Sequence, residues 1–205
     1  MDQTKILTFI IMGISAILVF VPVIGKALNH AVTLVHELGH ALSSLLLGGG
    51  VKAIRIETDG SGSTVSSQQM KFGYTINRLI VLLSGYSFPL YIGAGLILLA
   101  LLNNTVNIWV LVGLSIVSIL FIRNFFGLFI VLCFASFASL GLIIPNFPLY
   151  IVPSFLGAVF LIGGVKDIID ISKVVLTRRT SSSDFNFMEE QTHISSRFWV
   201  IFFYI

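Results

Sequence analysis

Two histidines and a glutamate stand in the pattern His36-Glu37-Leu38-Gly39-His40. Residues four apart lie one turn apart on the same face of a helix, so both imidazoles can bind one metal ion. The metal typical of this pattern is Zn2+, which lowers the pKa of a bound water toward about 7. Glu37 would take that proton and later pass it to a leaving amine. The pattern therefore predicts zinc-dependent hydrolysis of peptide bonds, with His36 and His40 as ligands.

The alternative is that these three side chains only satisfy hydrogen bonds inside a buried helix. The composition weakens this alternative, because 56% of the residues are hydrophobic and 10% are charged, which is typical of a membrane protein. An ionisable residue at the centre of a membrane helix costs about 2.5 to 3.5 kcal/mol, so three together need a partner such as a metal ion. Although the formal net charge is +3, we find no case for nucleic-acid binding.

Apolar segments of membrane-spanning length alternate with helix breakers and polar residues along the chain. They predict an all-α polytopic membrane protein with about six transmembrane helices, at residues 6–22, 26–47, 76–102, 107–122, 125–144 and 149–173. Residues 51–67 alternate around a turn and predict a small β-hairpin at the cytoplasmic surface. Residues 177–196 are expected to form a polar loop. Residues 1–205 are interpreted as a single integral-membrane domain.

Most cationic residues would share one side of the membrane if each of the six segments crosses it. The N-terminus would lie on that side, which the positive-inside rule identifies as cytoplasmic, and Lys26 would lie near the other. We therefore expect a multi-pass protein of the cell (inner) membrane with a cytoplasmic N-terminus. The cations on the predicted cytoplasmic side are Lys5, Lys52, Arg55, Lys71, Arg78, Arg123, Lys173, Arg178, Arg179 and Arg197.

The 26–47 segment carries more polar residues than a helix in contact with lipid should. They fall on one arc of the helical wheel, so this arc must face protein or a water-filled cavity. Helix packing is the simpler role for Asn29 and Thr33, which share the arc with the metal-binding pattern. The residues of the arc are Asn29, His30, Thr33, His36, Glu37, His40, Ser43 and Ser44.

A tetrahedral catalytic zinc takes three protein ligands and leaves a position for water. The single cysteine, Cys133, cannot provide a Cys-based site, so the third ligand must be a histidine or a carboxylate. With a rise of about 1.5 Å per residue, His40 lies about 10 Å and His36 about 16 Å from the end of the 26–47 segment. Asp167 lies about 9 Å from the end of the 149–173 segment, on the same side, and its depth matches best.

Other carboxylates stay open as the third ligand. Asp184 is the alternative, provided that the polar loop folds back into the cavity. Asp170 lies about 5 Å from the end of its segment, farther from the depth of the histidines. Asp167 also has a second possible role, as a carboxylate that reaches the membrane interface beside Lys166.

The metal-binding pattern is followed by Gly48-Gly49 and by Asp59-Gly60-Ser61-Gly62, and together these segments resemble the M50 family of metallopeptidases, in particular its M50B-like branch. That branch is similar to the site-2 proteases. Three later segments extend the resemblance over nearly the whole chain: Ser84-Gly85-Tyr86-Ser87-Phe88-Pro89, Arg123-Asn124, and Ser183-Asp184 with Thr192 and Trp199.

This resemblance implies an intramembrane zinc protease that cuts substrate segments in or next to the bilayer. It also implies that the substrate is added as a strand, for which the 51–67 hairpin could offer an edge. In site-2 proteases the third ligand is an aspartate of a Leu-Asp-Gly segment on a later membrane helix. This sequence has no such segment, and Asp167 is the nearest positional counterpart.

Two functions are therefore considered. The first is an intramembrane zinc-dependent endopeptidase that acts on a membrane-protein substrate within the lipid bilayer. The second is a non-proteolytic membrane protein that keeps a metal site for a structural, partner-binding or transport role. Glu37 has no evident role in a structural zinc site, so it favours the enzyme. The sequence identifies no substrate-binding residue and no oligomeric state.

Overall fold

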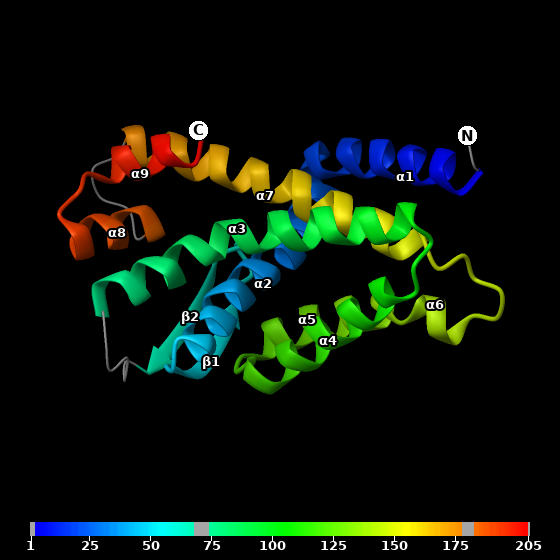
Figure 1. Ribbon diagram of the computed structural model, residues 1–205, viewed down its shortest axis with the longest axis horizontal. Coiled ribbons are helices and arrows are strands. Elements are labelled where there is room, and N and C mark those ends of the chain that lie inside the picture. The colour runs from blue at the N-terminus through cyan, green and yellow to red at the C-terminus, as the bar shows by residue number, and fades with distance from the viewer. Residues whose placement is uncertain (1–2, 68–73, 178–182, 205) are drawn as a thin grey trace.

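The computed structural model describes residues 3–67, 74–177 and 183–204 (Figure 1). Of the cations counted above, Lys71, Arg178 and Arg179 lie outside these ranges. The described residues are mostly helical and contain one two-stranded antiparallel sheet, as the sequence predicted.

Three helices are long and apolar enough to cross a membrane, namely α1 (Gln3–Phe20), α3 (Tyr74–Leu101) and α7 (Ile151–Thr177). Two further apolar helices are shorter, α4 (Val106–Phe121) and α5 (Phe125–Ala138), and α6 (Leu140–Ile143) follows α5. The helix with the polar arc is α2 (Pro22–Leu46). A helix therefore forms near each predicted span, but three of them, not six, have the length and composition of a membrane span.

The first helix runs in the opposite sense to the one predicted from the charges. If each of the six segments crossed the membrane in turn, α1 would be antiparallel to α7. Instead, Thr8 near the start of α1 contacts Ser154 near the start of α7. Val21, just after α1, lines the same pocket as Lys166, which lies farther along α7. The two helices are thus parallel, and α1 begins at the end of the molecule where α7 begins (Figure 1).

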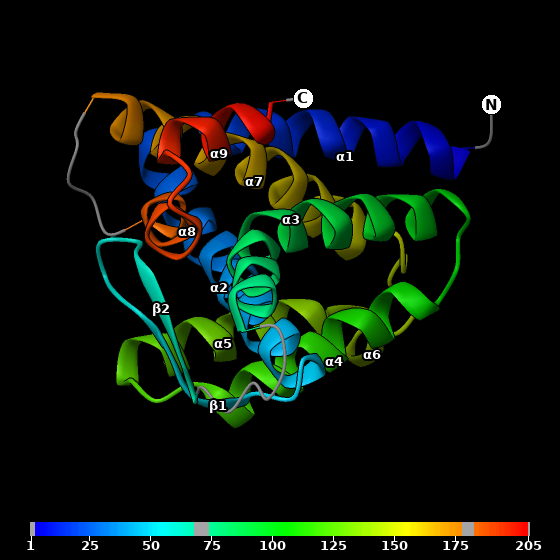
Figure 2. The ribbon, with the colours of Figure 1, turned by 60° about the vertical axis from the view of Figure 1, so that its left-hand side comes forward.

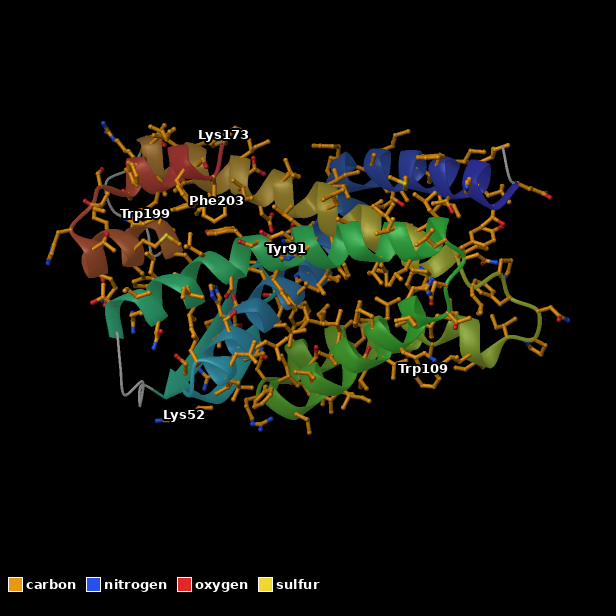
Figure 3. All side chains as sticks on the ribbon, viewed as in Figure 1. Lys52, Tyr91, Trp109, Lys173, Trp199 and Phe203 are labelled. Atoms are coloured by element: carbon orange, nitrogen blue, oxygen red, sulfur yellow. The ribbon has the colours of Figure 1, made fainter. Side chains whose placement is uncertain are left out.

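This difference follows from the junction between α1 and α2. Val21 is the single residue between them, and the Gly25 amide donates a hydrogen bond to the Val21 carbonyl. Helices that reverse direction are usually joined by two to eight residues. The chain therefore bends sharply instead of crossing back, as Figure 2 shows. The expected placement of the N-terminus beside Lys52 and Lys173 is wrong (Figure 3).

The predicted hairpin consists of β1 (Gly50–Ile56) and β2 (Gly62–Ser67), and it carries both buried and exposed residues. It folds back along α2 until the Thr33 hydroxyl donates to the Gly60 carbonyl, at 2.9 Å. Thr33 lies about 20 Å from the end of α2 at a rise of about 1.5 Å per residue. Ile54 and Ile56 are fully buried in the main apolar core, and their burial explains why the hairpin inserts into the molecule.

The corner between α4 and α5 covers the outer edge of β1. Asn124 donates from Nδ2 to the Ile56 carbonyl at 2.7 Å and accepts from the Ile56 amide at 3.2 Å. The Arg123 amide donates to the Ile54 carbonyl at 3.0 Å. These contacts provide hydrogen-bond partners for backbone groups of β1 that are buried in the apolar core and cannot bond to water. Among the described residues, β2 pairs with β1 alone, so its other edge stays available.

The predicted polar loop contains a helix that the sequence analysis missed. Residues Asp184–Thr192 form α8, capped by Ser183, and Ser196–Phe202 form α9. Phe185 and Met188 are fully buried because their spacing of three places them on one face of α8. With Trp199, which Figure 3 shows on α9, they pack in a second apolar cluster against α3 and α7.

The Asn124 contacts lead to a prediction about stability. Replacing Asn124 with Ala leaves the Ile56 amide and carbonyl buried without a partner, which should lower the free energy of unfolding by about 2 to 4 kcal/mol. Denaturation of the detergent-solubilised protein would measure the change. Asn104→Ala is the control, because Asn104 accepts one exposed hydrogen bond from the Val106 amide. Equal stability of the two variants would contradict the conclusion that the hydrogen bonds of Asn124 to Ile56 stabilise the protein.

Candidate metal centre

Five residues of the polar arc of α2 line a cavity of about 700 Å3, namely Asn29, Thr33, His36, Glu37 and His40. The opposite face of the helix carries Leu34, Val35 and Leu38, which are fully buried in the core and fix the rotation of α2. The cavity walls come from α2, β2 and the turn before it, α3, α7 and the start of α8. The lining residues used below are His36, Glu37, His40, Thr64, Asp167 and Asp184.

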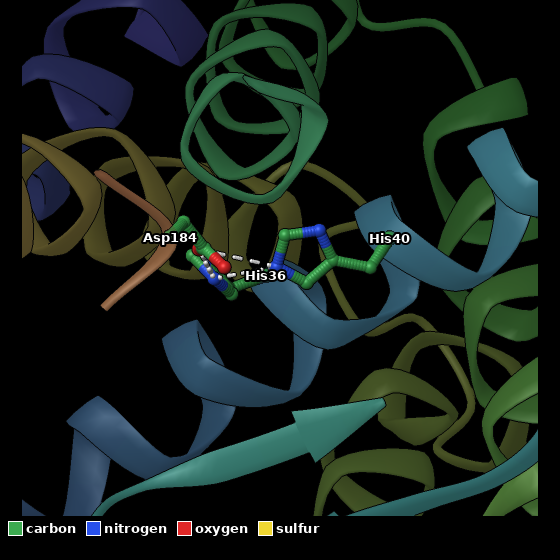
Figure 4. Close-up of side chains that lie close together, drawn as sticks. All are labelled: His36, His40 and Asp184. Atoms are coloured by element: carbon green, nitrogen blue, oxygen red, sulfur yellow. Dashed lines mark hydrogen bonds and ion pairs between the residues drawn. The ribbon is translucent and has the colours of Figure 1, made fainter. Parts of the chain in front are cut away.

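Three ligand atoms meet in this cavity (Figure 4). The Nε2 atoms of His36 and His40 lie 3.0 Å apart. The Asp184 Oδ2 atom lies 3.1 Å from the first and 3.3 Å from the second. Ligands of a tetrahedral zinc, each bound at about 2.0 to 2.1 Å, are separated by about 3.3 Å. The three atoms are therefore spaced as the ligands of one small metal ion would be.

The orientation of the His40 ring prepares its Nε2 atom for a metal. The Nδ1 atom of His40 donates a hydrogen bond to the Val81 carbonyl of α3, at 2.7 Å. A neutral imidazole that carries its proton on Nδ1 presents a lone pair on Nε2. A backbone carbonyl behind a ligating histidine is a common device for holding the ring in this state.

Asp184 is the first residue of α8, and its carboxylate turns inward toward α2. Burial by itself would raise the pKa of Asp184, but the charge and hydrogen bonds of His40 and His36 outweigh it and hold the pKa well below its ordinary value. The group is therefore ionised at neutral pH, which is the form that binds a metal.

Aromatic contacts join Asp184 to the histidine helix. Phe185, the next residue, stacks on Tyr86 of α3 with ring centroids 4.9 Å apart and an interplanar angle of 7°. The Tyr86 ring in turn meets the His36 ring edge-on at 4.7 Å. Phe203 closes the group with edge contacts to Tyr86 and Phe185. This aromatic cluster positions the start of α8 against the metal-binding face of α2.

Glu37 is buried beside the three ligand atoms but is not one of them. The Thr64 hydroxyl of β2 lies 2.7 Å from Glu37 Oε2 and 3.0 Å from the Glu37 carbonyl, so it can donate to either oxygen. A Cβ atom at Gly62 would lie 2.6 Å from Glu37 Oε1. The hairpin therefore reaches Glu37 because position 62 carries no side chain, and Thr64 then orients the carboxylate.

Two more glycines allow α3 to approach α2. A Cβ atom at Gly39 would lie 2.6 Å from the Ser84 carbonyl. A Cβ atom at Gly85 would lie 2.5 Å from His40 Nε2 and 2.7 Å from His36 Nε2. The bare Cα of Gly85 thus forms the wall against which both metal-binding nitrogens lie. The donor set and this wall together fit a zinc ion.

The structure brings together His36, His40 and Asp184, the alternative third ligand of the sequence analysis. Asp167, which depth favoured, lines the same cavity but is outside this group. Asp170 is half-exposed and pairs with Lys166. Depth alone favoured Asp167 because residues 177–196 were expected to form a loop, whereas α8 turns Asp184 back into the cavity.

Sequence reasoning also missed the roles of Thr64 and of the glycines around α2. Gly62 and Gly85 stand in segments that were recognised by resemblance, but no contact could be assigned to them. The available signal for Thr64 was its position two residues after Gly62 in a strand, where side chains at alternate positions share a face.

A family model described as peptidase M50B-like matches residues 9–205, nearly the whole chain. Comparisons with curated proteins and with solved structures gave no match. The matched residues include every element that lines the cavity.

The wall formed by Gly85 can be tested directly. Gly85→Ala should weaken zinc binding about 100-fold, because its methyl group would push both histidine rings out of place. Metal titration of the purified protein would measure the affinity. Gly95→Ala on the same helix is the matched control, since a Cβ atom there meets nothing within 4 Å. Unchanged affinity in Gly85→Ala would contradict the metal centre.

The aromatic cluster gives a second test of the third ligand. Phe185→Ala should weaken zinc binding roughly tenfold, because the preceding residue, Asp184, is then held less firmly. Phe185→Tyr keeps the stacked ring and should bind zinc with the affinity of the unaltered protein. The visible spectrum of the Co2+-loaded protein reports the ligand geometry and should change in Phe185→Ala. Phe202→Ala, at a half-exposed position of α9, should leave both readouts unchanged.

Proposed function

This chain belongs to the M50B-like peptidase family, and from that premise we propose that it is an intramembrane zinc-dependent endopeptidase acting on membrane-associated substrates. At the family level it is a membrane metallopeptidase, in keeping with its three helices of membrane-spanning character. The observation that carries the proposal is the buried Glu37 carboxylate, which lies outside a set of three metal-binding atoms and faces the same cavity.

The proposed centre assigns a role to each side chain. His36, His40 and Asp184 hold the metal, and zinc supplies Lewis acidity and an acidified water when bound. Glu37 accepts the proton of the attacking water and delivers it to the departing amine. Thr64 holds one Glu37 oxygen by donating to it, which leaves the other oxygen free for proton transfer.

The free edge of β2 suggests how a peptide could be presented. An extended peptide binds a strand edge through backbone hydrogen bonds, and such binding requires the substrate helix to unwind locally. β2 contacts Glu37 through Thr64 and contributes residues to the cavity lining, so a peptide added to its edge would run close to the base. This arrangement supports cleavage of segments that leave the bilayer or unwind within it.

The second candidate, a metal protein without proteolytic activity, fits less well. Structural zinc sites are commonly closed by four protein ligands. The group found among the described residues offers three, and the Glu37 carboxylate, which the Thr64 hydroxyl orients, lines the same cavity.

The proposal predicts that a change at Glu37 greatly slows peptide cleavage without abolishing zinc binding. Glu37→Gln should keep about one zinc per chain but cut a membrane-embedded test substrate at least about 100-fold more slowly, because it cannot accept a proton. His36→Ala and Asp184→Ala should lose zinc as well as cleavage. Elemental analysis and a gel-based cleavage assay measure the two properties.

Glu57→Gln serves as the control, because Glu57 is an exposed glutamate next to β1. Cleavage by Glu37→Gln at the rate of the unaltered protein would rule out the proposed mechanism. Full zinc retention by Asp184→Ala would instead remove Asp184 from the ligand set.

A further inference from the structure

Asp167 faces the cavity without belonging to the metal group. Its side chain interacts with the neutral amide of Asn29. Among the ion pairs found in the described part of the chain, none includes Asp167, whereas Asp170 on the same helix pairs with Lys166 at 2.9 Å and with Lys173 at 3.1 Å. Asp167 is therefore the cavity-lining carboxylate of α7 that makes no ion pair within the described part of the chain, although the charges of His36 and Lys166 act on it.

The charge of Asp167 is costly where it lies. α7 has the length and composition of a membrane span, and a carboxylate in such a helix is expected to have a partner. The two positive charges of a zinc ion would balance Asp184 and Glu37, and Asp167 would still have no ion-pair partner among the described residues. Arg78 also lines the cavity, but it lies one helical turn before Val81, whose carbonyl contacts His40. His40 is about 16 Å from Asn29 along α2, so Arg78 lies near His40 and not near Asn29.

The position of Asp167 relative to the base follows from Asn29. Asn29 precedes His36 by two helical turns, or about 10 Å. The hairpin turn lies at the same level, since a Cβ atom at Gly60 would come within 3.9 Å of Asn29 Nδ2. An extended peptide advances about 3.3 Å per residue, so one that follows β2 from the level of His36 to this turn covers the distance in about three residues.

We propose that Asp167, supported by Asn29, is a specificity subsite for a basic side chain, lysine or arginine, about three residues from the scissile bond on the side of the hairpin turn. The proposal rests on the peptidase function proposed above and deepens it. The substrate cation would supply the ion-pair partner that Asp167 does not find among the described residues, and a long basic side chain can reach across a cavity of this size with its stem in apolar surroundings.

Cleavage-site mapping provides the test. The full-length zinc-loaded protein in detergent is given a library of single-span model substrates whose segment next to the span is randomised, and the products are identified by mass spectrometry. The unaltered protein should enrich lysine and arginine about tenfold at one position, roughly three residues from the cut. Asp167→Asn should abolish the enrichment, and Asp167→Lys should shift it toward aspartate and glutamate. Asp170→Asn is the control and should preserve the original profile.

The outcomes distinguish the two proposals. Identical profiles for the unaltered protein and Asp167→Asn would overturn the subsite, and so would loss of zinc in Asp167→Asn, which would place Asp167 in the metal centre. Absence of any difference between the unaltered protein and Glu37→Gln would instead overturn the peptidase function. If Asp167→Lys does not fold, the comparison between Asp167→Asn and Asp170→Asn still decides the matter.

Discussion

The close approach of two backbones to the polar arc of α2 is the constraint on which the rest of this structure depends. β2 reaches Glu37 at Gly62, and α3 reaches His36 and His40 at Gly85. A methyl group at either position would enter the space of a functional side chain. At these two positions the wall of the cavity is peptide backbone, whose hydrogen-bonding groups are fixed by secondary structure and need little reorganisation during a reaction.

These approaches also explain how polar groups persist inside so apolar a chain. The Val81 carbonyl satisfies one histidine, Thr64 satisfies Glu37, and Asn124 satisfies the edge of β1. Each partner comes from a different element, so the cavity is stable only when hairpin, α3 and the α4–α5 corner are all in place. In this sense the core packing of Ile54 and Ile56 is a precondition for the chemistry proposed at Glu37.

The sequence predicted the hairpin, the mostly helical fold and the shared helix face of His36 and His40, because each has a local signal. His36 and His40 need only the period of a helix, and the hairpin needs only alternation around a turn. The direction of α1 and the depth of the hairpin depend on long-range packing. The charge pattern could not reveal that Val21 alone joins α1 to α2, and the hydropathy of 177–196 concealed the two buried residues of α8, Phe185 and Met188.

The origin of the third metal-binding atom has a thermodynamic consequence. His36 and His40 are held by a long helix in the core, whereas Asp184 stands in the first turn of a nine-residue helix that packs through one small apolar cluster. A short helix is marginal alone and owes its stability to tertiary contacts. A metal bound by all three side chains would add its binding energy to the docking of α8, and docking would add to metal affinity by the same amount. In the proposed centre, the metal and the C-terminal helices therefore stabilise each other.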